Sequence, residues 1–411
     1  MIILLAIYNL LVLPVIIFLS IILSIFNKKI RKGLVGRLSS LSRIKSFNSS
    51  KFSDIYWFHT SSHGEYQQIE TIIHKLKKSD PNIGIITSFF SPSGFENVND
   101  DNIDLKIYLP FDFILTSFKA LKLIKPKKIF FTSSDFWPSF LFVANNLNIS
   151  TILTSARYKK SYKIFLKMFD MIFCISDNDY QLMKSNISND KISVAGNPRY
   201  DRILNNLNNV EYKLENNIKE KNKILILASM WMEDNRIIFD NLIDSALINN
   251  FEKIIIVPHE ISEKYINYYC SGCKKRNITY KVINDYQNFK SFTEKFIIVN
   301  KVGFLSKLYL QTSITYVGGG FSKSGIHNII EPAAASNPVI FGPNFLNSNK
   351  LDAEGLINVS GGFSIESFNI FEEKINWLSD KENYNYSSDK CKSFVIENSG
   401  STKKILEVIN E

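Results

Sequence analysis

Residues 316–343 read Tyr-Val-Gly-Gly-Gly-Phe-Ser-Lys-Ser-Gly-Ile-His-Asn-Ile-Ile-Glu-Pro-Ala-Ala-Ala-Ser-Asn-Pro-Val-Ile-Phe-Gly-Pro. The apolar run Ile314–Val317 predicts a strand, a helix is expected to open near His327, and Pro338–Phe341 predicts a second strand. Two strands joined through a helix are the repeating unit of a parallel sheet that is covered on both faces. This stretch therefore predicts an α/β fold.

The loop inside this stretch has the composition of a nucleotide-binding turn. Gly318, Gly319 and Gly320 allow positive φ and let the backbone approach a phosphate closely. A helix N-terminus behind them offers N–H groups and the positive end of a dipole to an anion. Asn328 and Glu331, three residues apart, are expected on one helix face, with the Glu331 carboxylate near ribose hydroxyls. A plain glycine turn between strand and helix is the alternative.

Short apolar runs alternate with helical segments along both halves of the chain. The expected strands are Ile55–Phe58, Ile83–Thr87, Lys128–Thr132, Ile149–Thr154, Met171–Ile175, Ile224–Ala228, Ile254–Val257, Phe296–Val299, Ile314–Val317 and Val339–Phe341, and the clearest helices are Glu65–Leu76 and Ile114–Ile124. This alternation indicates parallel sheets with helices on both faces. We predict two doubly wound, Rossmann-like domains that face each other across a cleft, with ligands at the carboxyl ends of the strands.

A chain of 411 residues is too long for one core and fits two domains plus an anchor. The expected boundaries are 1–27 for a membrane anchor, 28–205 for the first domain, 206–222 for a polar linker and 223–411 for the second domain. The anchor is apolar up to Phe26 and long enough to span a bilayer. Because basic residues follow it directly, the body is expected on the cytoplasmic side. Pro14 leaves a tilted or re-entrant anchor open.

The formal net charge of +10 favours anionic partners such as nucleic acid, anionic lipid or a phosphorylated substrate. A genome bias toward Lys, Asn and Ile explains the same charge without a partner. Four cysteines are present, and Cys270 and Cys273 have CxxC spacing. No second Cys or His pair stands near them to complete a zinc site, so we expect reduced thiols.

Several motifs follow one another along the chain. They are Gly36-Arg37-Leu38, Trp57-Phe58-His59-Thr60-Ser61-Ser62-His63-Gly64-Glu65, Tyr108-Leu109-Pro110-Phe111-Asp112, Asp135-Phe136-Trp137-Pro138, Thr154-Ser155-Ala156-Arg157, Gly196-Asn197-Pro198-Arg199-Tyr200-Asp201, Val257-Pro258-His259-Glu260 and the glycine-rich segment 316–343, which is called the donor segment below. In this order, behind an apolar N-terminus, they resemble the Kdo transferases. These inverting glycosyltransferases of the GT-B type move 3-deoxy-D-manno-octulosonic acid (Kdo) from CMP-Kdo to lipid A precursors. The resemblance covers nearly the whole chain.

The resemblance implies that Glu65 is the catalytic base. A carboxylate placed at a helix start after a strand can take the proton of an acceptor hydroxyl. Taken alone, the spacing favours an ordinary first-turn Glu that complements the helix dipole. His63 departs from the family, which usually has Val or a similar small residue there; it either binds substrate or caps the turn.

Asp135 is the second candidate catalytic carboxylate. Family members often carry Glu-x-Glu where this chain has Ser133 and Asp135, so the first Glu is lost and the second is shortened. Asp135 is expected to position the acceptor or assist the base. A helix N-cap before Pro138 is the alternative.

The remaining candidates bind substrate or donor. Arg157 and Lys160 are expected to hold the Kdo carboxylate or an acceptor phosphate by charge-assisted hydrogen bonds, and Arg199 is a further basic candidate. For the donor, the candidates that join the glycines, Asn328 and Glu331 are Ser229, Pro258, His259 and Gly303. Where His259 stands the family often has Pro-Arg-His, so an Arg is missing or replaced; beside Gly303 a family Glu is lost.

The resemblance implies the partners CMP-Kdo, a lipid A precursor and inner-membrane lipid, with no nucleic acid, no metal and no resident cofactor. Two other functions stay open. One is a GT-B enzyme that uses a UDP-sugar for another glycolipid. The other is a lipid-binding scaffold that has lost catalysis, as the loss of Glu at Ser133 suggests.

Overall fold

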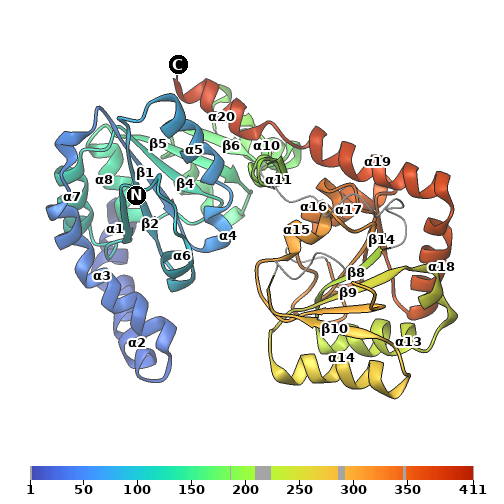
Figure 1. The fold of residues 1–411 in the computed structure, drawn as a ribbon. Coiled ribbons are helices and arrows are strands. Elements are labelled where there is room, and N and C mark those ends of the chain that lie inside the picture. The colour runs from blue at the N-terminus through green and yellow to red at the C-terminus, as the bar shows by residue number, and fades with distance from the viewer. Residues whose placement is uncertain (1, 186, 209–223, 286–291, 346–348, 411) are drawn as a thin grey trace. The chain divides into compact units, whose positions relative to one another are not determined.

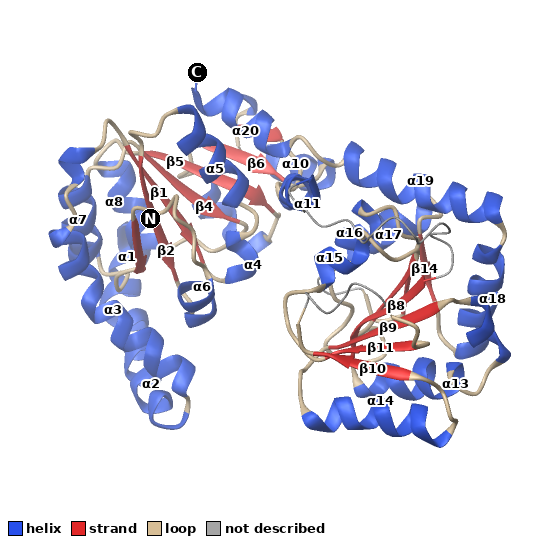
Figure 2. Cartoon of the chain, in the orientation of Figure 1, coloured by secondary structure: helices blue, strands red, loops and turns tan. Residues whose placement is uncertain are grey.

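The computed structural model describes residues 2–185, 187–208, 224–285, 292–345 and 349–410. It divides into two compact units, one of Met1–Arg202 with Ser399–Glu411 and one of Ile203–Asn398. Each unit contains a seven-stranded sheet, and Figure 2 shows helices on both faces of each sheet.

In unit 1 the strand order is β3-β2-β1-β4-β5-β6-β7, and all pairings are parallel. The strands are β1 (Ile55–Thr60), β2 (Gly84–Phe89), β3 (Leu105–Tyr108), β4 (Lys128–Thr132), β5 (Ser150–Ala156), β6 (Met171–Cys174) and β7 (Ile192–Val194). The helices of the body are α3 (Lys28–Ser46), α4 (His63–Tyr66), α5 (Glu70–Ser79), α6 (Pro92–Asn97), α7 (Ile114–Ile124), α8 (Pro138–Asn146), α9 (Lys163–Leu166), α10 (Asp177–Lys184) and α20 (Ser401–Asn410). The unit boundary falls inside α11 (Arg199–Asn208).

In unit 2 the order is β10-β11-β9-β8-β12-β13-β14, again all parallel. The strands are β8 (Ile224–Met230), β9 (Lys253–Pro258), β10 (Tyr280–Ile283), β11 (Phe296–Val299), β12 (Ile314–Val317), β13 (Val339–Phe341) and β14 (Gly362–Ser364). The helices are α12 (Met232–Asp234), α13 (Asp240–Leu242), α14 (Glu263–Lys275), α15 (Leu305–Tyr309), α16 (Ile330–Ala334), α17 (Lys350–Asn358), α18 (Phe368–Ser379) and α19 (Lys381–Glu397).

The central strands are buried on both faces because helices cover both sides of each sheet. Every residue of β1 and β2 is buried, and so is every residue of β11 and β12. Continuous apolar runs of this kind are typical of parallel sheets. The predicted strands in these positions are confirmed, whereas the predicted helix Glu65–Leu76 is split into α4 and α5.

The predicted second domain, 223–411, is wrong at its C-terminal end. α20 belongs to unit 1, where Ile405 and Ile409 join one of the apolar clusters on the sheet and Figure 1 shows it beside α5. The Asp201 carboxylate accepts hydrogen bonds from the N–H groups of Gly400 and Thr402, at 2.5 and 2.7 Å. These bonds occupy backbone donors at the helix start that would otherwise lack partners.

The predicted linker 206–222 lies outside the described residues from 209 onward, and residues 206–208 are the end of α11.

Within the described residues, Ile2–Phe26 is the one helical stretch long and apolar enough to cross a membrane. It consists of α1 (Ile2–Ile7), a π-helical turn (Tyr8–Val12) and α2 (Leu13–Phe26). The π turn ends two residues before Pro14, whose ring and missing N–H disturb regular α-helical bonding. α2 then turns at Asn27 into α3.

The apolar helix ends at Phe26 and α3 begins at Lys28, which agrees with the predicted anchor boundary of 1–27, and the helix also packs on the rest of unit 1. Two of its polar side chains, Tyr8 and Asn9, contact the rest of unit 1. The Asn9 side chain donates to Ser139 Oγ at 2.9 Å and accepts from the Ile114 N–H at 2.9 Å. The Tyr8 hydroxyl forms a hydrogen bond with Asp112. The start of this helix is therefore fixed to α7 and α8.

Candidate functional site

Unit 1 holds the two candidate catalytic carboxylates behind adjacent parallel strands. Glu65 follows β1 and Asp135 follows β4, and these strands pair directly. Because parallel strands end at one edge of the sheet, both side chains lie at the edge where ligands bind in α/β folds.

Glu65 stands in the first turn of α4. Its Oε2 accepts a hydrogen bond from the Ser61 N–H at 2.6 Å, and its own N–H donates to the Ser62 hydroxyl at 3.4 Å. Burial raises the pKa of Glu65 above its usual value, the bonds from Ser61 lower it, and the nearby charge of Asp135 raises it again. The carboxylate thus stabilises the helix start and also has the increased basicity that suits a general base.

Asp135 is bonded to a histidine that the sequence analysis did not single out. Its Oδ2 lies 3.0 Å from Nε2 of His59, which is fully buried on β1. The other ring nitrogen, Nδ1, lies 2.9 Å from the Ser88 hydroxyl on β2. The Trp137 indole nitrogen lies 3.0 Å from the same Nε2. One ring nitrogen cannot accept from Trp137 and donate to Asp135 together, so the position of the His59 proton links these groups.

The alternative role of Asp135 as an N-cap is wrong. The N-cap position of α8 is Trp137, which provides no side-chain cap. Asp112 serves the helix start instead, because its carboxylate accepts hydrogen bonds from the N–H groups of Ser139 and Phe140 at 3.0 and 2.8 Å. Burial raises the pKa of Asp112 to about 7.

The predicted basic residues partly gather near Asp135. Arg157 and Lys160 are exposed on the segment after β5, the neighbour of β4. Lys159, between them, donates to Ser134 Oγ at 3.2 Å, which ties this segment to the loop that carries Asp135.

The two other predicted substrate residues stand apart from that segment along the chain. His63 begins α4, and burial together with the charge of Arg202 lowers its pKa, so it is neutral at pH 7. Arg199 begins α11, where its N–H donates to Asn197 Oδ1 at 3.0 Å.

In unit 2 the glycines of the donor segment pack against backbone. A Cβ on Gly318 would lie 2.3 Å from the Ser229 carbonyl oxygen, and one on Gly319 would lie 2.3 Å from that of Gly325. A Cβ on Gly320 would lie 2.5 Å from Gly342. These positions therefore need glycine for packing against neighbouring backbone, and their contact with a phosphate stays a prediction.

Asp234, which the sequence analysis missed, organises this loop. Its carboxylate accepts hydrogen bonds from the Tyr316 hydroxyl at 2.7 Å, from the Gly319 N–H at 2.7 Å and from the Trp231 N–H at 3.1 Å. Burial raises the pKa of Asp234, while these bonds lower it. The Gly319 N–H is thus bonded within unit 2.

Asn328 and Glu331 form a pair at the start of α16, which begins at Ile330 rather than near His327. Asn328 Oδ1 accepts from the N–H groups of Ile330 and Glu331 at 3.0 and 3.4 Å, and Asn328 Nδ2 donates to Glu331 Oε1 at 2.8 Å. Asn328 and Glu331 therefore lie close together, as predicted. However, the Asn328 side chain caps the helix and occupies N–H groups that we expected to bind an anion.

Three aromatic rings stack beside this loop. The centroid of Trp231 lies 4.1 Å from that of His259, which lies 4.5 Å from that of His327, and the Trp231 indole N–H donates to His327 Nε2 at 2.8 Å. Burial lowers the pKa of His259. Burial, together with the charge of the neighbouring His259, lowers the pKa of His327 to about 4. Both imidazoles are neutral at pH 7, so His259 does not replace the charge of the missing Arg.

The other donor candidates stand at strand and helix ends of unit 2. Ser229 lies near the end of β8 with a positive φ of 53°, and Pro258 ends β9. Gly303 is exposed, with a φ of 88°, shortly before α15. Their roles toward a ligand stay predictions.

Comparison with known proteins shows which proteins this chain is similar to. Residues 36–202 match the family model described as 3-deoxy-D-manno-octulosonic-acid transferase (kdotransferase). A bifunctional glycosyltransferase/methyltransferase of Fusobacterium nucleatum is 28% identical over 377 residues, which cover 86% of this chain and 57% of that protein. A 3-deoxy-D-manno-octulosonic acid transferase of Rickettsia typhi is 26% identical over 358 residues, which cover 81% of this chain and 73% of that protein.

A solved glycosyltransferase from Rickettsia africae matches with a TM-score of 0.55 and 18% identity, over 86% of this chain and 97% of that one. These matches confirm the predicted resemblance to the Kdo transferases and the predicted GT-B fold.

The glycine packing generates a paired prediction about stability. Gly319 and Gly303 both have positive φ, but the room beside Gly319 is filled by backbone whereas nothing lies within 4 Å of the Cβ position of Gly303. We expect Gly303→Ala to lower the free energy of unfolding by about 1 kcal/mol, the cost of the backbone conformation. Gly319→Ala should cost roughly 2 kcal/mol more, because rigid backbone must move. Denaturant unfolding of both variants measures this, and equal costs would contradict the packing role.

Proposed function

We propose that this chain, whose residues 36–202 match the Kdo transferase family model, transfers Kdo from CMP-Kdo to a lipid A precursor in lipopolysaccharide synthesis. One observation supports this most: Glu65 and Asp135 follow adjacent strands of that region, and Asp135 lies 3.0 Å from His59 Nε2. The named Kdo transferases among the relatives support the donor.

In the proposed reaction, a hydroxyl oxygen of the acceptor attacks the anomeric carbon of Kdo. The bond from that carbon to the CMP phosphate oxygen breaks, and CMP leaves with the electron pair. Glu65 takes the hydroxyl proton, for which its raised pKa is favourable. Asp135, held by His59, orients the acceptor, and Arg157 and Lys160 bind the Kdo carboxylate or an acceptor phosphate.

The donor groups belong to unit 2. Glu331, held by Asn328, is assigned to the ribose hydroxyls, and the neutral stack of Trp231, His259 and His327 offers an aromatic face to the cytosine. Ser229 is assigned to the phosphate. The proposal includes no metal and no resident cofactor, as the family resemblance implies.

The proposed location is the bacterial inner membrane, with the body on the cytoplasmic face. Ile2–Phe26 supplies the apolar helix, and α3 begins with basic residues directly behind it. Such residues stay on the cytoplasmic side and attract anionic lipid.

The identity of the bound nucleotide distinguishes this proposal from a UDP-sugar enzyme and from a lipid-binding scaffold that has lost catalysis. At about 100 times its dissociation constant, CMP should raise the melting temperature by roughly 5 °C or more, whereas UDP should not. Glu331→Ala should weaken CMP binding about tenfold, because it removes the ribose acceptor. Glu354→Ala, an exposed change on α17, serves as the control. Stabilisation by UDP instead of CMP would refute the proposed donor.

The assignment of Glu65 as the catalytic base predicts the effect of replacing its carboxylate with an amide. Glu65→Gln keeps the size of the side chain but cannot take a proton, so kcat should fall at least about a hundredfold. CMP binding should be unchanged. The control is Glu96→Gln, in which the original carboxylate is exposed and pairs with Lys32. Asp135→Asn should cost less than Glu65→Gln. Near-normal turnover of Glu65→Gln beside an inactive Asp135→Asn would assign the base to Asp135.

The electrostatics of Glu65 predict the acid limb of the pH–rate profile. The base acts when ionised, so activity is lost as pH falls through the pKa of Glu65, above the usual 4.5. Asp135 contributes to that upward shift, and its negative charge is removed in Asp135→Asn. The limb should therefore move to lower pH in this variant, whatever its maximal rate. A limb that stays in place or moves upward would contradict the coupling.

A further inference from the structure

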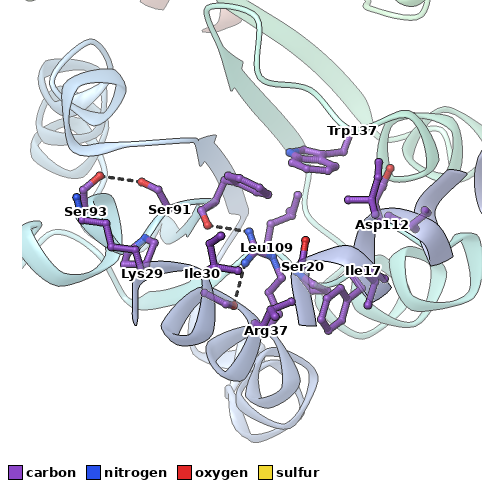
Figure 3. A pocket seen from close by; sticks show the side chains of 18 residues that line it. Ile17, Ser20, Lys29, Ile30, Arg37, Ser91, Ser93, Leu109, Asp112 and Trp137 are labelled. Atoms are coloured by element: carbon purple, nitrogen blue, oxygen red, sulfur yellow. Dashed lines mark hydrogen bonds between the residues drawn. The ribbon is translucent and has the colours of Figure 1, made fainter. Parts of the chain in front are cut away.

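Unit 1 contains a cavity of about 440 Å³ between α2, α3 and the segments that follow β2, β3 and β4. This volume is within the usual range for sites that bind small molecules. Its lining is largely apolar, with Ile17 of α2, Ile30 and Leu34 of α3, and Leu109 and Phe111 after β3. Figure 3 shows labelled side chains from both helices and from the body around it.

One side of the cavity adjoins the candidate catalytic groups. Trp137 lines the cavity, and its indole nitrogen lies 3.0 Å from His59 Nε2, the atom that also contacts Asp135. Arg37 lines it as well; its guanidinium donates to the carbonyl oxygens of Gly33 and Phe90 at 2.8 and 2.7 Å.

Cationic groups accompany the apolar lining. Burial lowers the pKa of Arg37 to about 10, so it remains a cation at neutral pH. Lys29, on the first turn of α3, is exposed and also lines the cavity. A ligand with an apolar body and an anionic head matches this combination.

The other side of the cavity is formed by the apolar helix. Phe18, Leu19 and Leu23 of α2 are exposed, which suits contact with lipid, while Ile17 and Ser20 line the cavity. The contacts of Tyr8 and Asn9 with unit 1 fix the helix that leads into α2. The cavity therefore lies between a surface suited to the bilayer and the Asp135–His59 pair.

We propose that this cavity binds an acyl chain of the glycolipid acceptor, with Arg37 and Lys29 at its phosphate. The inference rests on the proposed function, because that function supplies an acceptor with acyl chains and phosphate. Each methylene moved from water into an apolar site contributes about 0.8 kcal/mol. The chain then anchors the acceptor while its hydroxyl is presented to the carboxylates.

The test measures acceptor binding without any donor, so it does not depend on Kdo transfer. The full chain in detergent is titrated with a tetraacylated glucosamine disaccharide bisphosphate and with the same compound after removal of its ester-linked acyl chains. The wild type should bind the acylated compound at least about tenfold more tightly, since burial of roughly two methylenes gives that ratio. Ser20→Phe, which fills the cavity, should lose this preference.

Ser24→Phe is the matched control, because Ser24 lies one turn further along α2 and is not among the cavity-lining residues. It should keep the wild-type preference. The inference is overturned if Ser20→Phe keeps the preference, if Ser24→Phe loses it equally, or if excess phosphatidate displaces the acylated compound as effectively as unlabelled acceptor does. If acyl preference is present but CMP-Kdo is not used, only the proposed function fails.

Discussion

Burial of parallel strands on both faces is the constraint on which the rest of this structure depends. A strand such as β1 or β12, buried throughout, leaves no position along its length for solvated chemistry. Polar groups that act on a ligand must therefore follow the strands. Glu65 follows β1, Asp135 follows β4, and the donor segment follows β12. His59 is an exception, because it is buried on β1, but its Nε2 lies 3.0 Å from Asp135, which follows β4.

Carboxylates bonded to backbone N–H groups fix two helix starts in unit 1 and the glycine loop in unit 2. Asp112 orders the start of α8, Asp201 orders the start of α20, and Asp234 orders the glycine loop of unit 2. Each carboxylate accepts hydrogen bonds from backbone N–H groups that would otherwise lack a partner. A buried N–H group without a partner costs free energy. The glycines of the donor segment belong to this scaffold, since their missing side chains admit neighbouring backbone. These carboxylates and glycines thus position the loops that carry the candidate site residues.

The sequence predicted the central strands and missed all four edge strands, β3, β7, β10 and β14. Central strands are continuous apolar runs, whereas an edge strand such as Leu-Lys-Ile-Tyr in β3 mixes polar residues into a short segment. Glu65 and Asp135 were found through family motifs. The roles of His59, Asp112 and Asp234 depend on which strands and loops are neighbours, and local sequence does not contain that information. The docking of α20 on unit 1 was missed for the same reason.

The central claim, Kdo transfer to a lipid A precursor, is tested most directly by the mass of the product. The full chain is incubated in detergent with CMP-Kdo and a tetraacylated precursor, and the lipid fraction is analysed by mass spectrometry. Our account predicts an acceptor heavier by one or more Kdo residues, with release of CMP. An acceptor that stays unchanged with CMP-Kdo but gains a sugar from a UDP-linked donor would contradict it.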